Sequence, residues 1–502
     1  MATNAQQRMQ QLAGTQYIGG EYRPGSGLRR EIVDPATGAA FAHYTEATAD
    51  ETEAAVAAAA RAQKEWWALG ALDRANALHR VAMRLVEMSA LAGECLTREI
   101  GKPFRESNWE IGASASSFRY YAELARHDQG RVSGPVIAGQ LQMTLKEPLG
   151  TVVSIVPFNF PVLLFGWQAA AALAAGNAVI VKPSELTSLT LLMVMEAFDE
   201  LPRGLVQTLT GGAATGRHLV EHPGTHAVAF TGSVPAAQAV AEAAGRRFKP
   251  VLIEASGNDP FIVMPSAPVD VVAKGAAFAA FLNCGQVCTS AERFYVHEAV
   301  HDQFVTALAR EARALRLGSG LDRIDIGPLA SARERERVER IVTRAVEQGA
   351  RIVCGGRRPP HLSQGWFYEP TVLEVTHAME IMHGECFGPL APICKVRDLD
   401  EAIRLANDSD FGLGANIYTS DLAEAMRAVN EIESGIVWVN TPLNDNDCVP
   451  FGGRKLTGMG RELGAEGLEQ FRRSKMVMIS PTAEADPEWF PYPDRDAWPG
   501  GQ

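Results

Sequence analysis

The sequence predicts an α/β protein with two doubly wound domains, because two series of short apolar strands alternate with helices along the chain. The first series runs from about residue 150 to 255, and the pattern then starts again. A chain of 502 residues is too long for one ordinary core, and its 46% hydrophobic and 21% charged residues are typical of a globular protein.

The region before the first series is predicted to be mostly helical. Residues 17–45 combine short strands with turns. Residues 50–66 are rich in alanine and glutamate and predict a helix capped by Thr52 or Asp50. Helical patterning continues to about residue 127, with a break near residues 101–103.

The first domain is predicted from apolar strands of the kind that are buried in a parallel sheet. Its strands are expected at residues 150–157, 178–182, 206–209 and 227–231, with helices at 161–175 and 187–200. Ligands bind such sheets at the carboxyl ends of the strands.

The second domain is predicted from a repeat of this pattern. It contains strands at 260–264 and 293–296 and helices at 269–282 and 299–314. Residues 486–502 are rich in proline and aromatic residues, so no regular element is expected there.

Charge and cysteine content narrow the class of protein. The net charge of −12 argues against a nucleic-acid or anionic-membrane partner. Seven cysteines without a CxxC pair predict free thiols in a reducing compartment. The first residues are polar, and no run approaches the roughly 20 apolar residues of a membrane helix, so we expect a cytoplasmic protein.

Three side chains occupy positions that suit nucleophilic catalysis. Cys288 lies at the end of an element, where a thiolate with a base nearby acts as a nucleophile. Glu254 ends an apolar strand, and a raised pKa there would suit a general base. Asn159 lies between a strand and a helix, where its amide can donate to an oxyanion. Each has a structural alternative: a buried thiol, a salt-bridged strand end and a turn residue, respectively.

The same strand ends carry candidate cofactor residues. Lys182 and Glu185 follow a parallel strand, in a position to bind a ribose. Residues 230–233 end the next strand and open a helix whose free N–H groups can hold a pyrophosphate. The common GxGxxG signature of dinucleotide sites is absent from the sequence.

Two apparent metal motifs are interpreted as structural. His218, Glu221 and His222 match the HxxEH pattern of zinc proteases, but Pro223 breaks the helix directly afterwards. Cys284 and Cys288 have no further ligands in zinc spacing. No metal site is therefore expected.

Together, and in this order, the motifs closely resemble those of the aldehyde dehydrogenase superfamily, over about residues 17–480. The matching stretches are residues 157–161 (PFNFP), 182–185 (KPSE), 230–233 (FTGS), 254–257 (EASG), 281–288, 385–389 (ECFGP) and 450–453 (PFGG).

The resemblance implies a cofactor domain, a catalytic domain and a β-hairpin extension that joins subunits as a homodimer or homotetramer. The corresponding residues are 1–128 and 149–255 (NAD-binding), 256–456 (catalytic), 129–148 and 472–485 (oligomerisation strands), 457–471 (return segment) and 486–502 (aromatic tail). The aromatic tail is expected to pack on a neighbouring subunit.

The resemblance also implies a chemical role for each catalytic candidate. Cys288 attacks the aldehyde to give a thiohemiacetal, and the Asn159 amide and the Cys288 N–H hold its oxyanion. Glu254 activates the water that hydrolyses the resulting thioester. Branches that release the thioester to coenzyme A usually lack this glutamate. A coenzyme A-acylating enzyme and a non-catalytic structural relative remain the alternatives.

NAD is the cofactor that the resemblance implies, because the carboxylate of Glu185 would repel the 2′-phosphate of NADP. Lys182 and Glu185 would hold the adenine-side ribose, Ser233 the pyrophosphate and Glu385 the other ribose. The full predicted set is Val156, Lys182, Ser184, Glu185, Phe230, Gly232, Ser233, Glu385 and Phe387.

The substrate is expected to be a small aldehyde without a distal carboxylate. Branches of the family that act on succinate semialdehyde-like substrates carry an arginine at the position of Trp167. The predicted tunnel residues are Leu164, Trp167, Val287, Thr289, Asp445 and Phe451. Asp445 or Asp447 would favour a polar, hydroxy- or amino-aldehyde; the alternative is a solvated turn. Gln168 replaces a lysine common in the family, which weakens any proton relay there, whereas Glu462 matches and can serve one.

Overall fold

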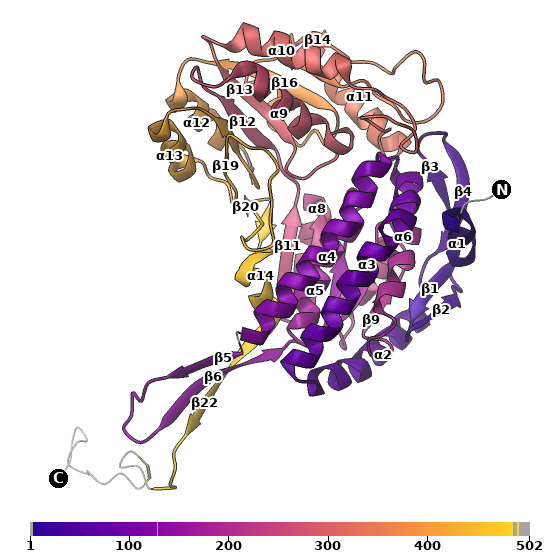
Figure 1. The fold of residues 1–502 in the computed structure, drawn as a ribbon, viewed down its shortest axis with the longest axis vertical. Helices are drawn as coiled ribbons and strands as arrows, with labels where there is room; N and C mark the ends of the chain where they lie inside the picture. Colours follow the sequence, from indigo (N-terminus) through magenta and orange to yellow (C-terminus); the bar gives the residue numbers. More distant parts are fainter. Residues whose placement is uncertain (1–3, 128, 485–488, 491–502) are drawn as a thin grey trace.

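The computed structural model describes residues 4–127, 129–484 and 489–490. Figure 1 shows two lobes, each with a sheet between helices, and a narrow arm that projects from one of them. The prediction of two α/β domains is confirmed. Among the described residues, no helix combines the length and apolar composition needed to cross a bilayer.

The lobe that carries the arm is built on an eight-stranded sheet in the order β2-β1-β9-β8-β7-β10-β11-β21. The five central strands, from β9 to β11 in this order, are parallel to one another. At the edges, β1 is antiparallel to β9, β2 to β1, and β21 to β11. Their bounds are β1 (Thr15–Ile18), β2 (Glu21–Pro24), β7 (Thr151–Ile155), β8 (Ala178–Lys182), β9 (Val206–Thr208), β10 (Ala227–Gly232), β11 (Val251–Ala255) and β21 (Gly458–Met459).

The register of these strands brings distant candidate residues to one edge of the sheet. Ile155 pairs with Lys182 and with Phe230, and Thr231 pairs with Glu254. The segments that follow β7, β8, β10 and β11 therefore emerge side by side, as parallel strands require.

Helices cover both faces of this sheet (Figure 1). They are α1 (Asn4–Leu12), α2 (Ala49–Ala68), α3 (Ala71–Ile100), α4 (Phe104–His127), α5 (Pro161–Ala174), α6 (Ser188–Val194), α7 (Ala213–Glu221), α8 (Val234–Gly245) and α14 (Gly464–Glu469). Helix α5 is buried along almost its whole length, which fits its apolar sequence.

Two local predictions in this lobe are wrong. The cap of α2 is Thr48, which forms a capping box with Glu51, rather than Thr52 or Asp50. The helix expected at residues 187–200 is divided into η1 (Glu185–Thr187), α6 and η2 (Met195–Phe198). The buried carboxylate of Glu99 accepts hydrogen bonds from the N–H groups of Leu189 and Thr190, which fixes the start of α6 from outside the segment.

The second lobe has a seven-stranded sheet in the order β14-β15-β16-β13-β12-β18-β19. Its strands are β12 (Asp259–Val263), β13 (Ala291–His297), β14 (Arg351–Cys354), β15 (Thr371–Glu374), β16 (Leu390–Val396), β18 (Asn416–Tyr418) and β19 (Trp438–Val439). Its helices are α9 (Val269–Phe281), η3 (Leu282–Gly285), α10 (His301–Ala314), α11 (Ala332–Glu347), η4 (Glu380–Met382), α12 (Leu399–Asn407) and α13 (Leu422–Glu431). Two small two-stranded sheets lie outside these main sheets. They pair β3 (Arg29–Asp34) with β4 (Ala39–Thr45) and β17 (Phe411–Gly412) with β20 (Arg454–Lys455).

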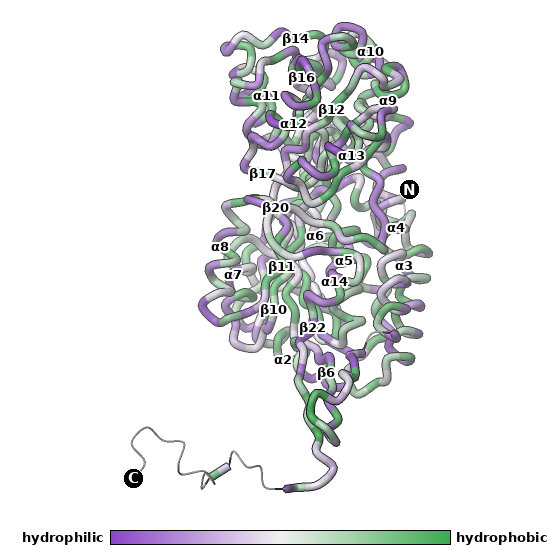
Figure 2. The backbone as a smooth tube through the Cα atoms, turned by 90° about the vertical axis from the view of Figure 1, so that its left-hand side faces the viewer, coloured by the Kyte–Doolittle hydropathy of each residue, from purple (hydrophilic) through white to green (hydrophobic). Residues whose placement is uncertain are grey.

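The arm is a three-stranded antiparallel sheet in the order β22-β6-β5. It contains β5 (Gly130–Ser133), β6 (Leu141–Pro148) and β22 (Arg472–Ile479), which are the segments predicted to join subunits. Figures 1 and 2 show the arm projecting away from both lobes, with hydrophobic residues along it. Of the predicted aromatic tail, only Trp489 and Phe490 belong to the described residues, and both are exposed.

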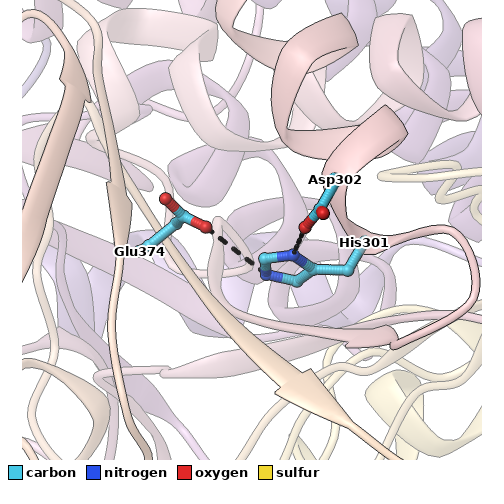
Figure 3. A group of neighbouring side chains, drawn as sticks. All are labelled: His301, Asp302 and Glu374. Atoms are coloured by element: carbon cyan, nitrogen blue, oxygen red, sulfur yellow. Dashed lines mark hydrogen bonds and ion pairs between the residues drawn. The ribbon is translucent and has the colours of Figure 1, made fainter.

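The histidines of the second lobe form structural hydrogen bonds. Figure 3 shows His301 between Asp302 and Glu374, with Nδ1 2.8 Å from one carboxylate and Nε2 4.0 Å from the other. The two ring nitrogens face different carboxylates, and one ligand atom from each of the three residues lies within 4.8 Å of the others. Lys395 and Arg351 already pair with these carboxylates.

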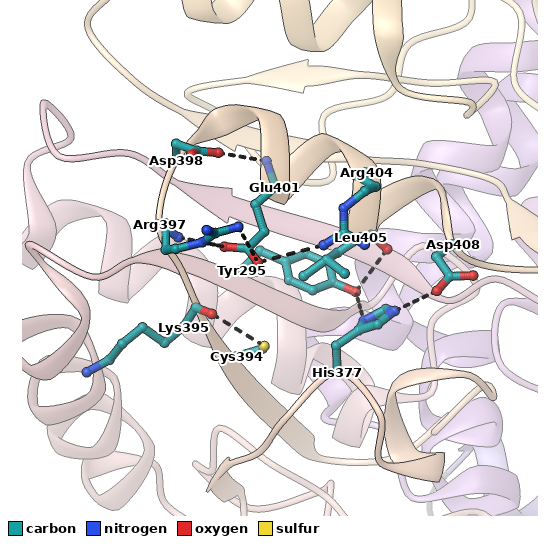
Figure 4. Close-up of polar contacts among 10 residues, drawn as sticks. All are labelled: Tyr295, His377, Cys394, Lys395, Arg397, Asp398, Glu401, Arg404, Leu405 and Asp408. Atoms are coloured by element: carbon teal, nitrogen blue, oxygen red, sulfur yellow. Dashed lines mark hydrogen bonds and ion pairs between the residues drawn. The ribbon is translucent and has the colours of Figure 1, made fainter.

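A second group anchors the segment after β15. Figure 4 shows His377 between Tyr295 of β13 and Asp408, which follows α12. The Nδ1 atom is 3.0 Å from the Tyr295 hydroxyl and Nε2 is 3.0 Å from the Asp408 carboxylate. These contacts fix the start of the loop that leads to Glu385.

His222 of the HxxEH motif and the nearby His226 are likewise engaged in structure. His222 Nε2 lies 2.8 Å from the Glu53 carboxylate, and its Nδ1 accepts the N–H of Gly224. His226 Nδ1 accepts the N–H of Thr151. These contacts agree with the structural interpretation of the motif.

Candidate active site

A cavity of about 330 Å³ lies where the carboxyl ends of β7, β10 and β11 meet the second lobe. Its walls include the predicted residues Asn159, Leu164, Gly232, Ser233, Glu254, Cys288, Glu385 and Phe387. The structure thus gathers the three catalytic candidates and part of the cofactor set in one cavity.

Asn159 is held in one orientation by the loop that carries Cys288. Its Nδ2 donates to the backbone oxygen of Gln286 at 3.1 Å, and the Asn283 amide donates to the Asn159 backbone oxygen at 3.3 Å. Because one amide N–H is used in this way, the second is left for another acceptor. A fixed donor of this kind can stabilise a developing oxyanion.

The backbone before Cys288 forms an unusual turn. Asn283, Cys284 and Gly285 follow one another with φ values of 49°, 57° and 72°. Left-handed conformations cost non-glycine residues about 1 to 3 kcal/mol each. One side chain supports the turn: Gln286 Nε2 donates to the Asn283 oxygen, and Gln286 Oε1 accepts the N–H of Ala330.

Cys288 is half-buried and lies beside Glu254. Burial and the nearby Glu254 carboxylate raise the pKa of the Cys288 thiol well above its ordinary value. Burial and the Glu462 carboxylate likewise raise the pKa of Glu254 well above its ordinary value. The free protein therefore favours a neutral thiol, so the nucleophile needs a proton acceptor rather than a standing thiolate.

Both carboxylate oxygens of Glu254 are buried without a hydrogen-bond partner among the described residues. An unpartnered buried carboxylate is costly in a purely structural role. The arrangement instead suits a group that exchanges a proton with the thiol or with water.

A buried polar network lies behind Glu254. Gln168 Nε2 donates to Glu462 Oε1 at 2.9 Å and to Thr231 Oγ1 at 3.1 Å, and Gln168 Oε1 accepts from Ser154. Burial raises the pKa of Glu462 to about 7, against the effect of the Gln168 hydrogen bond.

The residues predicted to bind a ribose lie beyond this cavity, after β8. Lys182 is buried, and burial lowers its pKa to about 8, although the Glu185 carboxylate raises it. Glu185 accepts a hydrogen bond from the Tyr44 hydroxyl at 3.2 Å, and Ser184 Oγ accepts the N–H of Leu186. Among the described residues, the Lys182 ammonium has no hydrogen-bond partner, which leaves it available to a ligand hydroxyl.

The start of α8 fits a phosphate group. Ser233 is its N-cap, but the hydroxyl makes no capping hydrogen bond, and the helix has 12 residues. The N–H groups of Val234 and Ala236 and this hydroxyl can therefore donate to an anion, whereas Pro235 has no N–H. Val156 and Phe230 are only 2% and 5% exposed, so they shape this site from beneath rather than line the cavity.

The loop that carries Glu385 and Phe387 is held from both sides. The buried Glu292 carboxylate accepts the N–H groups of Cys386 and Phe387 at 2.7 Å each, and Arg337 donates to the backbone oxygens of the same loop. Phe387, with a φ of 40°, meets Phe158 edge-on with ring centroids 5.9 Å apart. Glu385 accepts the N–H of Gly257 at 3.1 Å.

The predicted tunnel residues divide into two groups. The rings of Trp167 and Phe451 are 4.9 Å apart. Leu164 lines the cavity. Trp167 and Val287 are each 7% exposed and Thr289 and Phe451 each 3% exposed, so these four residues pack behind its lining.

The two aspartates of the tunnel loop have different surroundings. Asp447 accepts hydrogen bonds from the hydroxyls of Ser116 and Ser117 on α4, so its carboxylate is occupied. Asp445 is exposed, and desolvation by the surrounding protein raises its pKa to about 6. Its charge reaches Cys288 and Asp259, whose pKa values it helps to raise.

Comparison with known proteins identifies the family of this chain. The pattern described as the aldehyde dehydrogenase family matches residues 22–477. The chain belongs to the aldehyde dehydrogenase family. Members are oxidoreductases that use a nicotinamide cofactor, so the predicted family and class of enzyme are confirmed.

Individual relatives cover nearly the whole aldehyde dehydrogenase chain. The peroxisomal aminoaldehyde dehydrogenase 1 of Malus domestica is 36% identical, over 92% of this chain and 94% of its own. The structure of Staphylococcus aureus betaine aldehyde dehydrogenase with NAD+ is 30% identical, with a TM-score of 0.93, covering 98% of this chain and 99% of its own. A 3,6-anhydro-L-galactose dehydrogenase in complex with NAP is 36% identical, with a TM-score of 0.89, covering 92% and 99%.

Several positioning residues were not predicted from the sequence. Gln286 orients Asn159, Glu292 and Arg337 hold the Phe387 loop, and Glu106 and Glu110 contact the catalytic loops from α4. Their partners are distant along the chain, and only the burial of acidic residues within apolar patterns hinted at such roles.

Proposed function

We propose that this aldehyde dehydrogenase oxidises an aldehyde with a cationic nitrogen to its carboxylate, through a thioester on Cys288 that water cleaves. The observation that carries the proposal is the Cys288 thiol beside the unpartnered Glu254 carboxylate, in one cavity with the oriented Asn159 amide.

The first half of the reaction begins with proton transfer from the Cys288 thiol to the Glu254 carboxylate. The sulfur then forms a bond to the aldehyde carbon, and the carbonyl electrons move to its oxygen. The Asn159 amide and the Cys288 N–H donate to this oxyanion. A nicotinamide held beside Phe387 would supply the acceptor for the hydride of this carbon, which would leave a thioester on Cys288.

The second half removes the acyl group. Glu254, having released its first proton to solvent, takes another from water as the water oxygen attacks the thioester carbon. The tetrahedral adduct expels the Cys288 thiolate, which takes this second proton from Glu254 as the acid leaves, and the enzyme is restored. The Glu254 carboxylate thus favours hydrolysis over transfer to coenzyme A.

The residues present fit NAD. Lys182, Ser184 and Glu185 would hold the adenine-side ribose, Ser233 and the start of α8 the pyrophosphate, and Glu385 the second ribose beside Phe387. The Glu185 carboxylate disfavours the 2′-phosphate of NADP, because like charges repel.

Glu462 is proposed to buffer the proton on Glu254. It is buried, it has a pKa of about 7, and it raises the pKa of Glu254. The intervening Gln168 amide orients Glu462 but does not itself titrate, so this coupling is electrostatic rather than a lysine-mediated relay.

The preference for a cationic substrate rests on Asp445. Its carboxylate lies near the nucleophile and has no hydrogen-bond partner among the described residues, whereas Asp447 is bound to Ser116 and Ser117. The rings of Trp167 and Phe451, 4.9 Å apart, are proposed to flank the path of the substrate. The names of the Malus domestica and Staphylococcus aureus relatives, an aminoaldehyde and a betaine aldehyde dehydrogenase, support this class of substrate.

The arm is proposed to join subunits into a homodimer or homotetramer, since its apolar side chains have no core of their own. A cytoplasmic location stays a prediction; the Malus domestica relative is described as peroxisomal.

The direct test mixes the protein with NAD or NADP and a panel of aliphatic, hydroxy-, amino- and trimethylammonium aldehydes, with and without coenzyme A. We expect reduced NAD without coenzyme A, and the highest kcat/KM for cationic aldehydes. Cys288→Ala should abolish turnover while retaining NAD binding. Turnover by Cys288→Ala, or a strict need for coenzyme A, would contradict the mechanism, and inactivity on every aldehyde would favour a structural protein.

A further inference from the structure

Helix α4 carries two carboxylates that face the two catalytic loops. Glu106 and Glu110 are four residues apart, so they lie on the same face of the helix. Neither belongs to the residues that contact substrate or cofactor in the proposed reaction.

Glu110 holds the beginning of α5, directly after Asn159. Its Oε1 accepts the N–H groups of Val162 at 2.8 Å and Leu163 at 3.3 Å, which are among the free donors of that helix terminus. Its Oε2 lies 2.5 Å from the buried Lys102 ammonium, which in turn sits 3.5 Å from the centre of the Phe160 ring. Both ends of the short segment after Asn159 are thereby fixed to α4.

Glu106 holds the other loop. Its Oε2 accepts the N–H of Asn283 at 3.1 Å, the first residue of the left-handed turn before Cys288. The same Asn283 donates through its side chain to the backbone oxygens of Asn159 and Gln286. The Gln286 oxygen is the acceptor that orients the Asn159 amide.

We propose that α4 sets the separation of the two catalytic loops, with Glu110 fixing the Asn159 loop and Glu106 fixing the Cys288 loop. The oxyanion donor is then aligned with the nucleophile by a helix that contacts neither reactant. Glu106 and Glu110 are positioning residues, and the inference rests on the proposed roles of Asn159 and Cys288.

The test is a double-mutant cycle between Glu106→Ala and Asn159→Ala, with kcat measured at saturating NAD and aldehyde. Losing an oxyanion donor costs about 100- to 1,000-fold in kcat, so losing its alignment should cost roughly 10-fold or more. We expect Glu106→Ala to show this loss in the wild-type background and less than about 3-fold loss in the Asn159→Ala background. Equal losses in both backgrounds, or no loss in the first, would overturn the proposal.

Rescue and a matched control separate alignment from folding. Glu106→Gln keeps an oxygen that can accept the Asn283 N–H, so it should restore kcat. Asn177→Ala removes another buried acceptor of a backbone N–H, that of Gly150 at 2.8 Å, at the opposite end of the sheet; it should lower Tm but leave kcat unchanged. Loss of kcat in Glu106→Gln equal to that in Glu106→Ala would also overturn the proposal.

Two further measurements keep the outcomes distinct. If Glu106→Ala does not fold, Glu106→Asp, which shortens the side chain by one methylene, replaces it in the same cycle with the same expected pattern. If Cys288→Ala retained turnover, the proposed function would fail, whereas the cycle alone decides whether α4 aligns the loops.

Discussion

Neither oxygen of the Glu254 carboxylate has a hydrogen-bond partner among the described residues, so burial and Glu462 raise its pKa well above the ordinary value. The folded protein therefore binds this proton more tightly than the unfolded chain does. The resulting stabilisation is complete below the pKa of the unfolded glutamate and is lost as the pH rises through the folded pKa.

The raised pKa of Glu254 leads to a prediction about the stability of Glu254→Gln. An amide cannot ionise, so the variant avoids the growing cost of a buried charge. We expect its Tm to exceed that of the wild type by a margin that grows as the pH rises above about 4.3, the ordinary pKa of glutamate, measured by calorimetry. Glu242→Gln, at an exposed site on α8, is the control. If this difference in Tm stays constant or shrinks as the pH rises, the pKa of Glu254 is not raised in the folded protein.

Short motifs indicated Cys288, Glu254 and Asn159 as catalytic candidates, because each lies at or just after the end of an apolar strand or helix, and the structure brings the three into one cavity. The residues that hold the surrounding loops could not be predicted. Asn159, Asn283 and Phe387 form hydrogen bonds with partners that are separated from them by 127, 177 and 95 positions in the sequence. The choice between Asp445 and Asp447 likewise needed Ser116 and Ser117, which lie on α4.

At the scale of elements, the strands most clearly predicted were those buried on both faces. Strands β7, β8 and β10 are almost wholly buried, so their sequences are continuous apolar runs. Strands β19, β20 and β21 have two residues each, too few for any pattern. The division of the helix at residues 187–200 depends on Glu99 of α3, outside the segment.

The arm leads to a prediction at the same scale. A three-stranded sheet that buries neither face is marginally stable alone, and Met476 and Val132 are 79% and 68% exposed on it. We expect the wild type to be a dimer or tetramer and Met476→Asp to dissociate into smaller species, measured by size exclusion with light scattering. Met83→Asp places the same change on exposed α3 and should leave the assembly intact. A monomeric wild type, or an unchanged assembly of Met476→Asp, would contradict this role of the arm.

At the scale of the whole molecule, the site exists only where the two lobes meet. Asn159, Ser233 and Glu254 come from the first sheet, whereas Cys288 and Phe387 belong to the second lobe. Periodicity predicted each lobe separately but carried no information about how they face one another. That information entered through the family resemblance, which the comparisons confirmed.

The charge of the molecule gives the last prediction. The net charge is −12, and the carboxyl groups of Glu254, Asp259 and Asp445 all lie close enough to Cys288 to raise its pKa. Acidic groups near a cleft attract cations, here in competition with Arg333 and Arg337 of the same cavity, and salt screens this effect over a Debye length of about 10 Å at 0.1 M. We expect kcat/KM for a trimethylammonium aldehyde to fall with rising salt, while the neutral aldehyde with carbon in place of nitrogen changes less than about 2-fold.

Asp445→Asn separates the contact from the general field. The amide keeps the size of the side chain but removes the charge that has no partner among the described residues. The variant should lose kcat/KM mainly for the cationic aldehyde and show a shallower salt dependence, with the neutral aldehyde as its internal control. Parallel salt dependence for the two aldehydes would mean that the acidic groups near Cys288 serve proton transfer alone. The cation would then be recognised by the aromatic walls of Trp167 and Phe451, which salt does not screen.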